Sequence, residues 1–150
     1  MTNMKMSREE QEAYLAERSL AIVAVPSDGR APVVTPVLYR YDASEGIVFI
    51  CTPDGEKGRR VAVGSPITVN VQDDAVKFNE SYVTIEGDVS SVEPDDGLAE
   101  LQRLVERYYG PEGANTYMAF IPENFALTVV KVRPKRWLSR DYAKAWGQQS

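Results

Sequence analysis

Six short stretches of the chain show either strict alternation of apolar and polar residues or a continuous apolar run, and this pattern predicts six β-strands. They are residues 19–25, 32–41, 47–52, 67–72, 81–89 and 125–133. In the fourth stretch Ile67, Val69 and Val71 fall on one face, which predicts that this face lies in the core. In the fifth, Gly87 interrupts the pattern as a β-bulge would.

The remaining segments predict helices and loops. Ser7 followed by Glu10 three residues later forms a capping box, which predicts a helix over 7–18. Leucines at helical spacing predict a longer helix from about 93 to 110, ended by Gly110 and Pro111. Residues 114–120 are expected to add another turn or two of helix. We expect a polar loop at 73–80 and a short basic, aromatic tail at 134–142.

Short consecutive strands joined by tight turns favour an antiparallel sheet closed into a small barrel, because closure removes the exposed edges. The expected fold is mainly β (α+β), with flanking helices, in one domain over residues 1–150. Pro36 lies inside the second strand and cannot donate to a ladder. It marks a plain sheet edge, a bulge or a place where a ligand approaches the backbone, and the sequence leaves these alternatives open.

Composition excludes several classes of partner and site. The net charge is −5 and the pI about 4.8, which argues against a nucleic-acid or membrane-surface protein. No apolar run reaches membrane-spanning length, and the first residues carry no apolar signal core. Cys51 is the single cysteine, so we expect a cytoplasmic protein and read Cys51 as a buried packing residue.

The chain contains no histidine. This excludes Ser-His and Cys-His nucleophile pairs, histidine-based metal sites and haem held by a protein histidine. We therefore expect no catalytic metal. An enzyme with this composition would depend on a bound organic cofactor for its chemistry.

Residues 51–60 combine turn-forming residues with three cations, Lys57, Arg59 and Arg60. Pro53, Gly55 and Gly58 break regular structure, and a short helical segment to Val63 is expected to follow. Free backbone N–H groups beside cations suit a phosphate. The same spacing is also typical of a solvated basic turn.

Five short motifs, in this order and spacing, resemble the pyridoxamine 5'-phosphate oxidase-like family of flavin-binding split β-barrels, also called flavin/deazaflavin oxidoreductases. The motifs are 29–32, 35–37, 49–52, 57–60 and 66–71. The likeness covers nearly the whole chain. The basic loop and the compact length resemble the branch that uses coenzyme F420. The family implies a six-stranded split barrel and a homodimer with a cofactor, F420 or alternatively FMN, in each interface cleft.

The resemblance also implies roles for individual residues. Thr35, Pro36 and Val37 would line the cofactor ring, largely through their backbone. Ile50, Cys51 and Thr52 would hold the ribityl chain and the phosphate. Lys57, Arg59 and Arg60 would neutralise that phosphate. Tyr82 and Trp137 would reach the ring or the substrate from the partner subunit.

One departure from the family bears on activity. Pyridoxamine phosphate oxidases carry a histidine and an arginine near the C-terminus. The corresponding segment here, residues 136–140, contains Arg136 and Arg140 but no histidine. The sequence thus argues against vitamin B6 oxidation. The resemblance implies an oxidoreductase that moves a hydride between F420 or FMN and a small organic substrate. The alternative is a carrier or sensor that binds the same cofactor without turnover.

Overall fold

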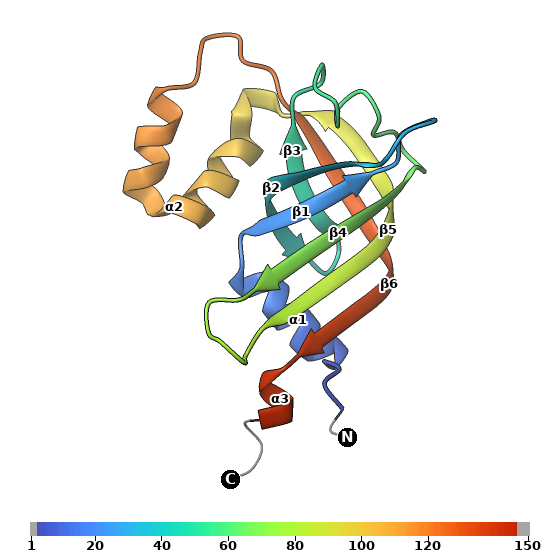
Figure 1. The fold of residues 1–150 in the computed structure, drawn as a ribbon. Coiled ribbons are helices and arrows are strands. Elements are labelled where there is room, and N and C mark those ends of the chain that lie inside the picture. Colours follow the sequence, from blue (N-terminus) through green and yellow to red (C-terminus); the bar gives the residue numbers. More distant parts are fainter. Residues whose placement is uncertain (1–2, 147–150) are drawn as a thin grey trace.

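The computed structural model describes residues 3–146. Six antiparallel strands form a closed barrel in the order β1-β2-β3-β6-β5-β4 (Figure 1). The strands are β1 (Leu20–Val25), β2 (Val33–Asp42), β3 (Gly46–Cys51), β4 (Pro66–Asp73), β5 (Ser81–Pro94) and β6 (Thr128–Asp141). The helices are α1 (Arg8–Glu17), α2 (Ala99–Ala119) and α3 (Ala143–Trp146), with a short 3-10 turn at Asp96–Leu98. The predicted six-stranded barrel is confirmed.

Alternating side chains fill the barrel, as the sequence pattern predicts. Ile67, Val69 and Val71 are buried, and so are Val83 and Ile85 on the neighbouring strand. The helix α1 adds Tyr14 and Leu15 to the same core cluster. Its capping box is present, because Ser7 Oγ accepts the N–H of Glu10 and the Glu10 carboxylate accepts that of Ser7. Burying one leucine such as Leu15 is worth about 1.5–3 kcal/mol, so α1 contributes directly to the core.

Two predictions about the end of the chain are wrong. The long helix does not start near 93, because β5 continues to Pro94 and pairs there with Thr128 of β6. The basic tail 134–142 is not a tail, because β6 continues through it to Asp141. Each segment looked irregular on its own and becomes a strand because a distant segment pairs with it: residues 93–94 pair with 128–129, and residues 134–141 pair with 81–87. The predicted bulge is present, since the register shifts between Glu86 and Gly87.

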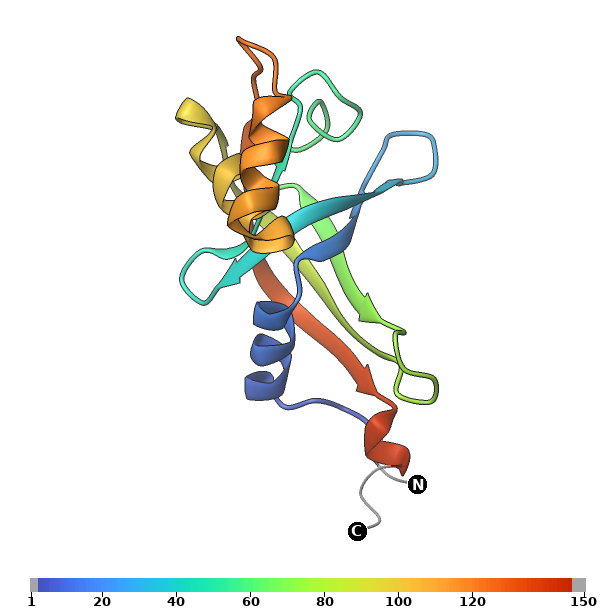
Figure 2. The same ribbon diagram turned by 90° about the vertical axis from the view of Figure 1, so that its left-hand side faces the viewer.

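The helix α2 is two helical segments. Gly110 has φ +80° and ψ 172°, which breaks the helix before Pro111, as the sequence predicted. The segment after the break runs to Ala119, which confirms the expected extra turns. Figure 2 shows the two segments standing side by side at one side of the barrel. Their apolar faces pack on the outward side chains Leu38 and Ile50.

The two ends of the barrel differ. The 52–65 loop lies at one end, and the segment before α1, the helix α3 and the 74–80 loop lie at the other (Figures 1 and 2). Among residues 3–146, no helix combines the length and the apolar character required to cross a bilayer.

Candidate functional site

The barrel is split between β2 and β3. The strand β2 pairs with β1 from Val33 to Leu38, but it pairs with β3 only from Tyr39 to Asp42. The β3-facing edge of residues 33–38 therefore has no ladder partner within the described chain. Pro36 lies in this open stretch, where its missing N–H breaks no ladder bond. An open backbone edge can accept or donate hydrogen bonds to a flat ligand.

The loop that follows β3 is a series of turns. The N–H of Gly55 returns to Thr52 O at 3.1 Å, and those of Arg59 and Val61 reach Gly55 O and Lys57 O at 3.1 and 3.0 Å. The expected short helix to Val63 is wrong, because no continuous helical ladder forms between these interrupted bonds. None of the hydrogen bonds among the described residues uses the N–H of Glu56, Lys57 or Gly58. Consecutive free amides of this kind form an anion-binding concavity.

These amides border a small recess of about 60 Å³. It is lined by Thr35, Cys51, Thr52, Gly55, Glu56, Lys57 and Gly58. The Thr35 hydroxyl oxygen is buried and has no hydrogen-bond partner within the described residues, an arrangement that costs stability unless a ligand or water completes it. Lys57 forms no ion pair with any described residue. The recess thus offers a hydroxyl, free amides and one cation, which fits a phosphate group.

Gly58 is required by the close packing of this loop. A Cβ built there would lie 2.1 Å from Thr52 O and 2.8 Å from Pro53 O, both of them backbone atoms. A larger residue would push the 56–58 amides out of place. The sequence showed Gly58 only as a turn-forming residue, because this contact is between chain segments.

The two arginines of the loop lie in a neighbouring groove, apart from Lys57. Arg59 and Arg60 line it together with Ser27 and other residues of the β1–β2 turn and the start of β4. Both guanidinium groups pair with Glu56, and the Arg60 Nε donates to Ser27 Oγ at 3.0 Å. Sequence reasoning grouped the three cations, whereas the structure divides them into one free lysine and two arginines that share a carboxylate.

Cys51 faces the barrel core and is buried, in agreement with its interpretation as a packing residue. Burial raises the pKa of its thiol, and nearby Lys57 opposes this only partly. At neutral pH the sulfur is therefore the neutral thiol, which is a poor nucleophile.

The other predicted contact residues are spread over several surfaces. Pro36 is exposed on the outer face of β2, whereas Val37 points into the barrel core. Ile50 points outward beneath α2, away from the recess. Tyr82 and Trp137 line a separate hollow near the N-terminus. The Trp137 ring is engaged within its own chain, edge-on to Tyr41 at 5.9 Å and beneath the Arg8 guanidinium at 4.1 Å.

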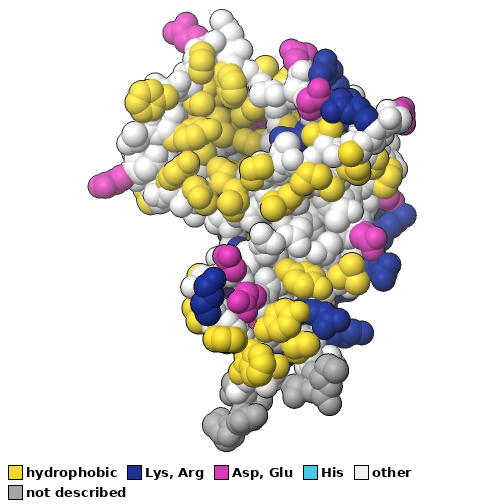
Figure 3. Space-filling view, in the orientation of Figure 1, with side chains coloured by type: hydrophobic (Ala, Val, Ile, Leu, Met, Phe, Trp, Pro, Cys, Tyr) yellow, Lys and Arg dark blue, Asp and Glu magenta, His cyan; other side chains and the backbone are white. Residues whose placement is uncertain are grey.

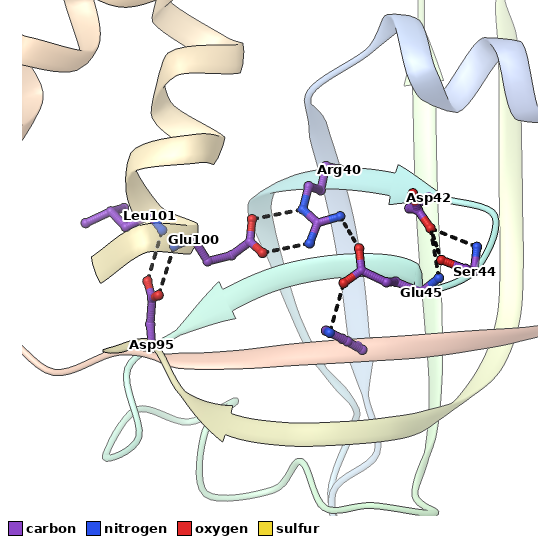
Figure 4. A network of polar contacts seen from close by, with 8 residues as sticks. Arg40, Asp42, Ser44, Glu45, Asp95, Glu100 and Leu101 are labelled. Atoms are coloured by element: carbon purple, nitrogen blue, oxygen red, sulfur yellow. Dashed lines mark hydrogen bonds and ion pairs between the residues drawn. The ribbon is translucent and has the colours of Figure 1, made fainter. Parts of the chain in front are cut away.

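A buried ion-pair network that sequence reasoning missed holds α2 beside the split. Arg40 forms two hydrogen bonds with the Glu100 carboxylate, at 2.9 and 2.8 Å, and one with Glu45 at 2.5 Å (Figure 4). Asp95 accepts the N–H groups of Glu100 and Leu101 at 2.9 Å and so caps the same helix. The network fixes the helix that covers Ile50.

Comparison with known proteins identifies a family match. The family model described as "Pyridoxamine 5'-phosphate oxidase" matches residues 7–137. No curated protein matches the sequence.

Solved structures share the fold. A conserved hypothetical protein, Rv2991 from Mycobacterium tuberculosis, superposes with a TM-score of 0.70 at 18% identity, covering 97% of this chain and 91% of that one. A structure titled F420 reductase has a TM-score of 0.68 at 21% identity and covers 85% and 94%. The FAD and haem binding protein from Mycobacterium smegmatis has a TM-score of 0.63 at 21% identity and covers 92% and 72%. At these identities the likeness concerns the fold.

Proposed function

The chain belongs to the pyridoxamine 5'-phosphate oxidase family, and from this premise we propose that it is a cytoplasmic oxidoreductase that uses coenzyme F420, or alternatively FMN. The reaction would move a hydride between that cofactor and a small organic substrate. The observation that carries the proposal is the recess at the split of the barrel, where free amides, the unpartnered Thr35 hydroxyl and Lys57 converge. The similar fold of a protein titled F420 reductase supports the choice of cofactor.

In this proposal the recess holds the cofactor phosphate. The Glu56, Lys57 and Gly58 amides donate to its oxygens, Thr35 Oγ1 donates its proton, and the Lys57 ammonium neutralises charge. Thr52 and Cys51 shape the wall toward the ribityl chain. The loop backbone that carries these amides is held by its turns and by the close approach of Gly58 to Thr52, so little free energy of ordering the backbone is lost on binding.

The ring would lie along the open edge of β2 at residues 35–37, where the Pro36 carbonyl faces it. The bound cofactor supplies the hydride chemistry, which flavins and deazaflavins carry without a side-chain acid or base. The chain would orient the ring and exclude water from it. Ile50, under α2, forms apolar structure behind this edge.

We further propose that the protein is a homodimer whose partner completes the cleft. Figure 3 shows a broad hydrophobic area at the upper end of the molecule. Exposed apolar side chains on β1, β2 and α2 support an interface with the partner subunit in this area. They include Leu20, Val34, Tyr117 and Phe120. Light scattering after size exclusion is expected to give twice the chain mass of 16.7 kDa. A monomer at micromolar concentration that still binds cofactor would refute this arrangement.

The function is tested by purifying the protein from a host that makes both cofactors. Absorbance and mass spectrometry are expected to detect F420 or FMN in near-equal amount to the chain. Turnover with a reducible organic substrate then separates an enzyme from a carrier or sensor. Protein that emerges without either cofactor, and binds neither in fluorescence titration, would contradict the proposal.

A further inference from the structure

The loop between β4 and β5 contains a strained residue at the end of the barrel opposite the cofactor recess. Residues 76–79 form a turn in which the Asn79 N–H donates to Val76 O at 3.1 Å, and Phe78, its third residue, has φ +71°. A turn of this type favours glycine or asparagine there. A bulky side chain in the left-handed region is an outlier that costs stability.

Burial does not offset this strain, because the Phe78 side chain is 71% exposed. The other two non-glycine residues with positive φ within residues 3–146 have ordinary explanations. Leu98 packs into the apolar cluster under α2, and Asn124 is a residue type that adopts this conformation readily. Strain that the fold itself does not use points to a function for the side chain.

Phe78 belongs to an exposed apolar cluster. Its ring meets Trp146 edge-on at 6.2 Å, and Trp146 and Val76 are each 58% exposed. The N–H of Tyr142 donates to Glu80 O at 3.0 Å, which fixes α3 against the same loop. Figure 3 shows hydrophobic side chains gathered at the lower end of the molecule, with acidic side chains beside them.

A groove of about 400 Å³ runs from this cluster along α1. Met6, Ala13, Tyr14 and Val76 provide apolar lining, and four carboxylates also line it: Glu10, Glu17, Asp73 and Asp141. Arg18 is the one cation of the lining among the described residues, and it pairs with Asp73 at 2.9 Å and with Glu17 at 3.8 Å. Glu10 pairs with Lys144 at 2.8 Å, whereas Asp141 has no ion pair within the described chain. The groove therefore keeps a negative charge.

The Arg18 guanidinium lies 3.5 Å above the Tyr14 ring, and its Nε is buried, out of reach of an occupant of the groove. The groove and the neighbouring cluster therefore offer carboxylates and apolar side chains. An occupant that supplies cations and an apolar side chain together has the chemistry of a peptide.

We propose that this groove and the Val76, Phe78 and Trp146 cluster form a docking site for a linear segment of a partner protein, with Lys or Arg side chains flanking an apolar anchor. The anchor packs on the aromatic pair, and the cations face the groove carboxylates. The site is independent of the proposed cofactor chemistry, because it lies at the other end of the barrel.

The test uses a fluorescein-labelled peptide, acetyl-Lys-Leu-Lys-Phe-Lys-amide, and a matched peptide with Glu in place of each Lys. Fluorescence anisotropy with the full chain is expected to show binding of the Lys peptide, weakening with salt, and none of the Glu peptide. Phe78→Asn is expected to lower the affinity at least about tenfold while raising the melting temperature by about 2–4 °C, because the strain is relieved. Val63→Asn, at an exposed apolar residue in the loop at the other end of the barrel, serves as the control.

A second pair of variants tests the charge. Glu17→Lys is expected to weaken Lys-peptide binding, and Glu106→Lys, the same change on an exposed face of α2, is not. The proposal is overturned if the Lys peptide fails to bind, or if Phe78→Asn leaves binding unchanged. It is also overturned if Phe78→Asn changes the oligomeric state in light scattering, since a second copy of the chain would then be the occupant.

Discussion

Replacing Arg40 by methionine is expected to destabilise the protein by about 3–5 kcal/mol, the usual cost of removing one partner from a buried ion pair. The Arg40 side chain is only 7% exposed and that of Glu100 11%, so the variant leaves a carboxylate buried without its cation. Methionine keeps the apolar stem, which separates loss of charge from loss of packing. Denaturant unfolding of parent and variant measures the difference.

Two further variants make this prediction specific. Arg136→Met removes a surface pair with Glu86, whose side chains are 68% and 46% exposed, and should cost less than about 1 kcal/mol. Arg40→Met combined with Glu100→Leu should recover much of the loss, because an apolar pair of similar volume can replace a buried ion pair. Equal losses in the free energy of unfolding for Arg40→Met and Arg136→Met would show that the network does not hold α2.

The network also carries a pH signature. Hydrogen bonds from Arg40 and then from Lys131 lower the pKa of Glu45 from 4.5 to about 2. A lowered pKa in the folded state gives stability that is present above pH 4.5 and is lost as the pH falls toward 2. The difference in stability between parent and Arg40→Met should therefore narrow across that interval.

The sequence predicts the barrel because each strand and helix has a signal within its own short stretch of residues. Alternation along 67–72 identifies the buried face of β4, and the capping box locates the start of α1. Prediction from the sequence fails where a strand depends on pairing with a distant segment. The extension of β5 to Pro94, which pairs with Thr128, is an example. The Arg40 network has the same character, because its partners come from β2, the β2–β3 turn, α2 and β6, and no spacing in the chain reveals them.

The candidate site shows the same limit. Three cations within four residues indicate an anion, and the loop after β3 is where the structure provides free amides. The sequence cannot divide those cations, because the division depends on which of them Glu56 reaches. Glu56 pairs with Arg59 and Arg60 and leaves Lys57 at the recess. The resemblance implies that Thr35 lines the ring, and the structure adds that Thr35 lines the recess with Lys57 and that its hydroxyl has no partner among the described residues.

This division predicts different effects for the loop cations on the two cofactors. Lys57→Ala is expected to weaken FMN and F420 alike, by about ten- to a hundredfold, because a charge-assisted contact with phosphate is worth about 1.5–3 kcal/mol. Fluorescence titration of both cofactors measures the affinities. Lys77→Ala, at an exposed lysine on the opposite end of the barrel, is the control and should leave both unchanged.

Arg59→Ala is expected to weaken the binding of F420 more than the binding of FMN. F420 extends beyond the shared phosphate through a lactyl phosphodiester and a glutamate tail, and the groove lined by Arg59 and Arg60 begins beside the recess. FMN ends at the phosphate and has no group to place there. The Arg59 side chain is 61% exposed, so its contribution should also fall as salt is raised, and F420 affinity should decline with salt more steeply than FMN affinity. If F420 is weak at both salt concentrations and FMN binds tightly, the groove does not hold a cofactor tail, and the recess alone defines an FMN site.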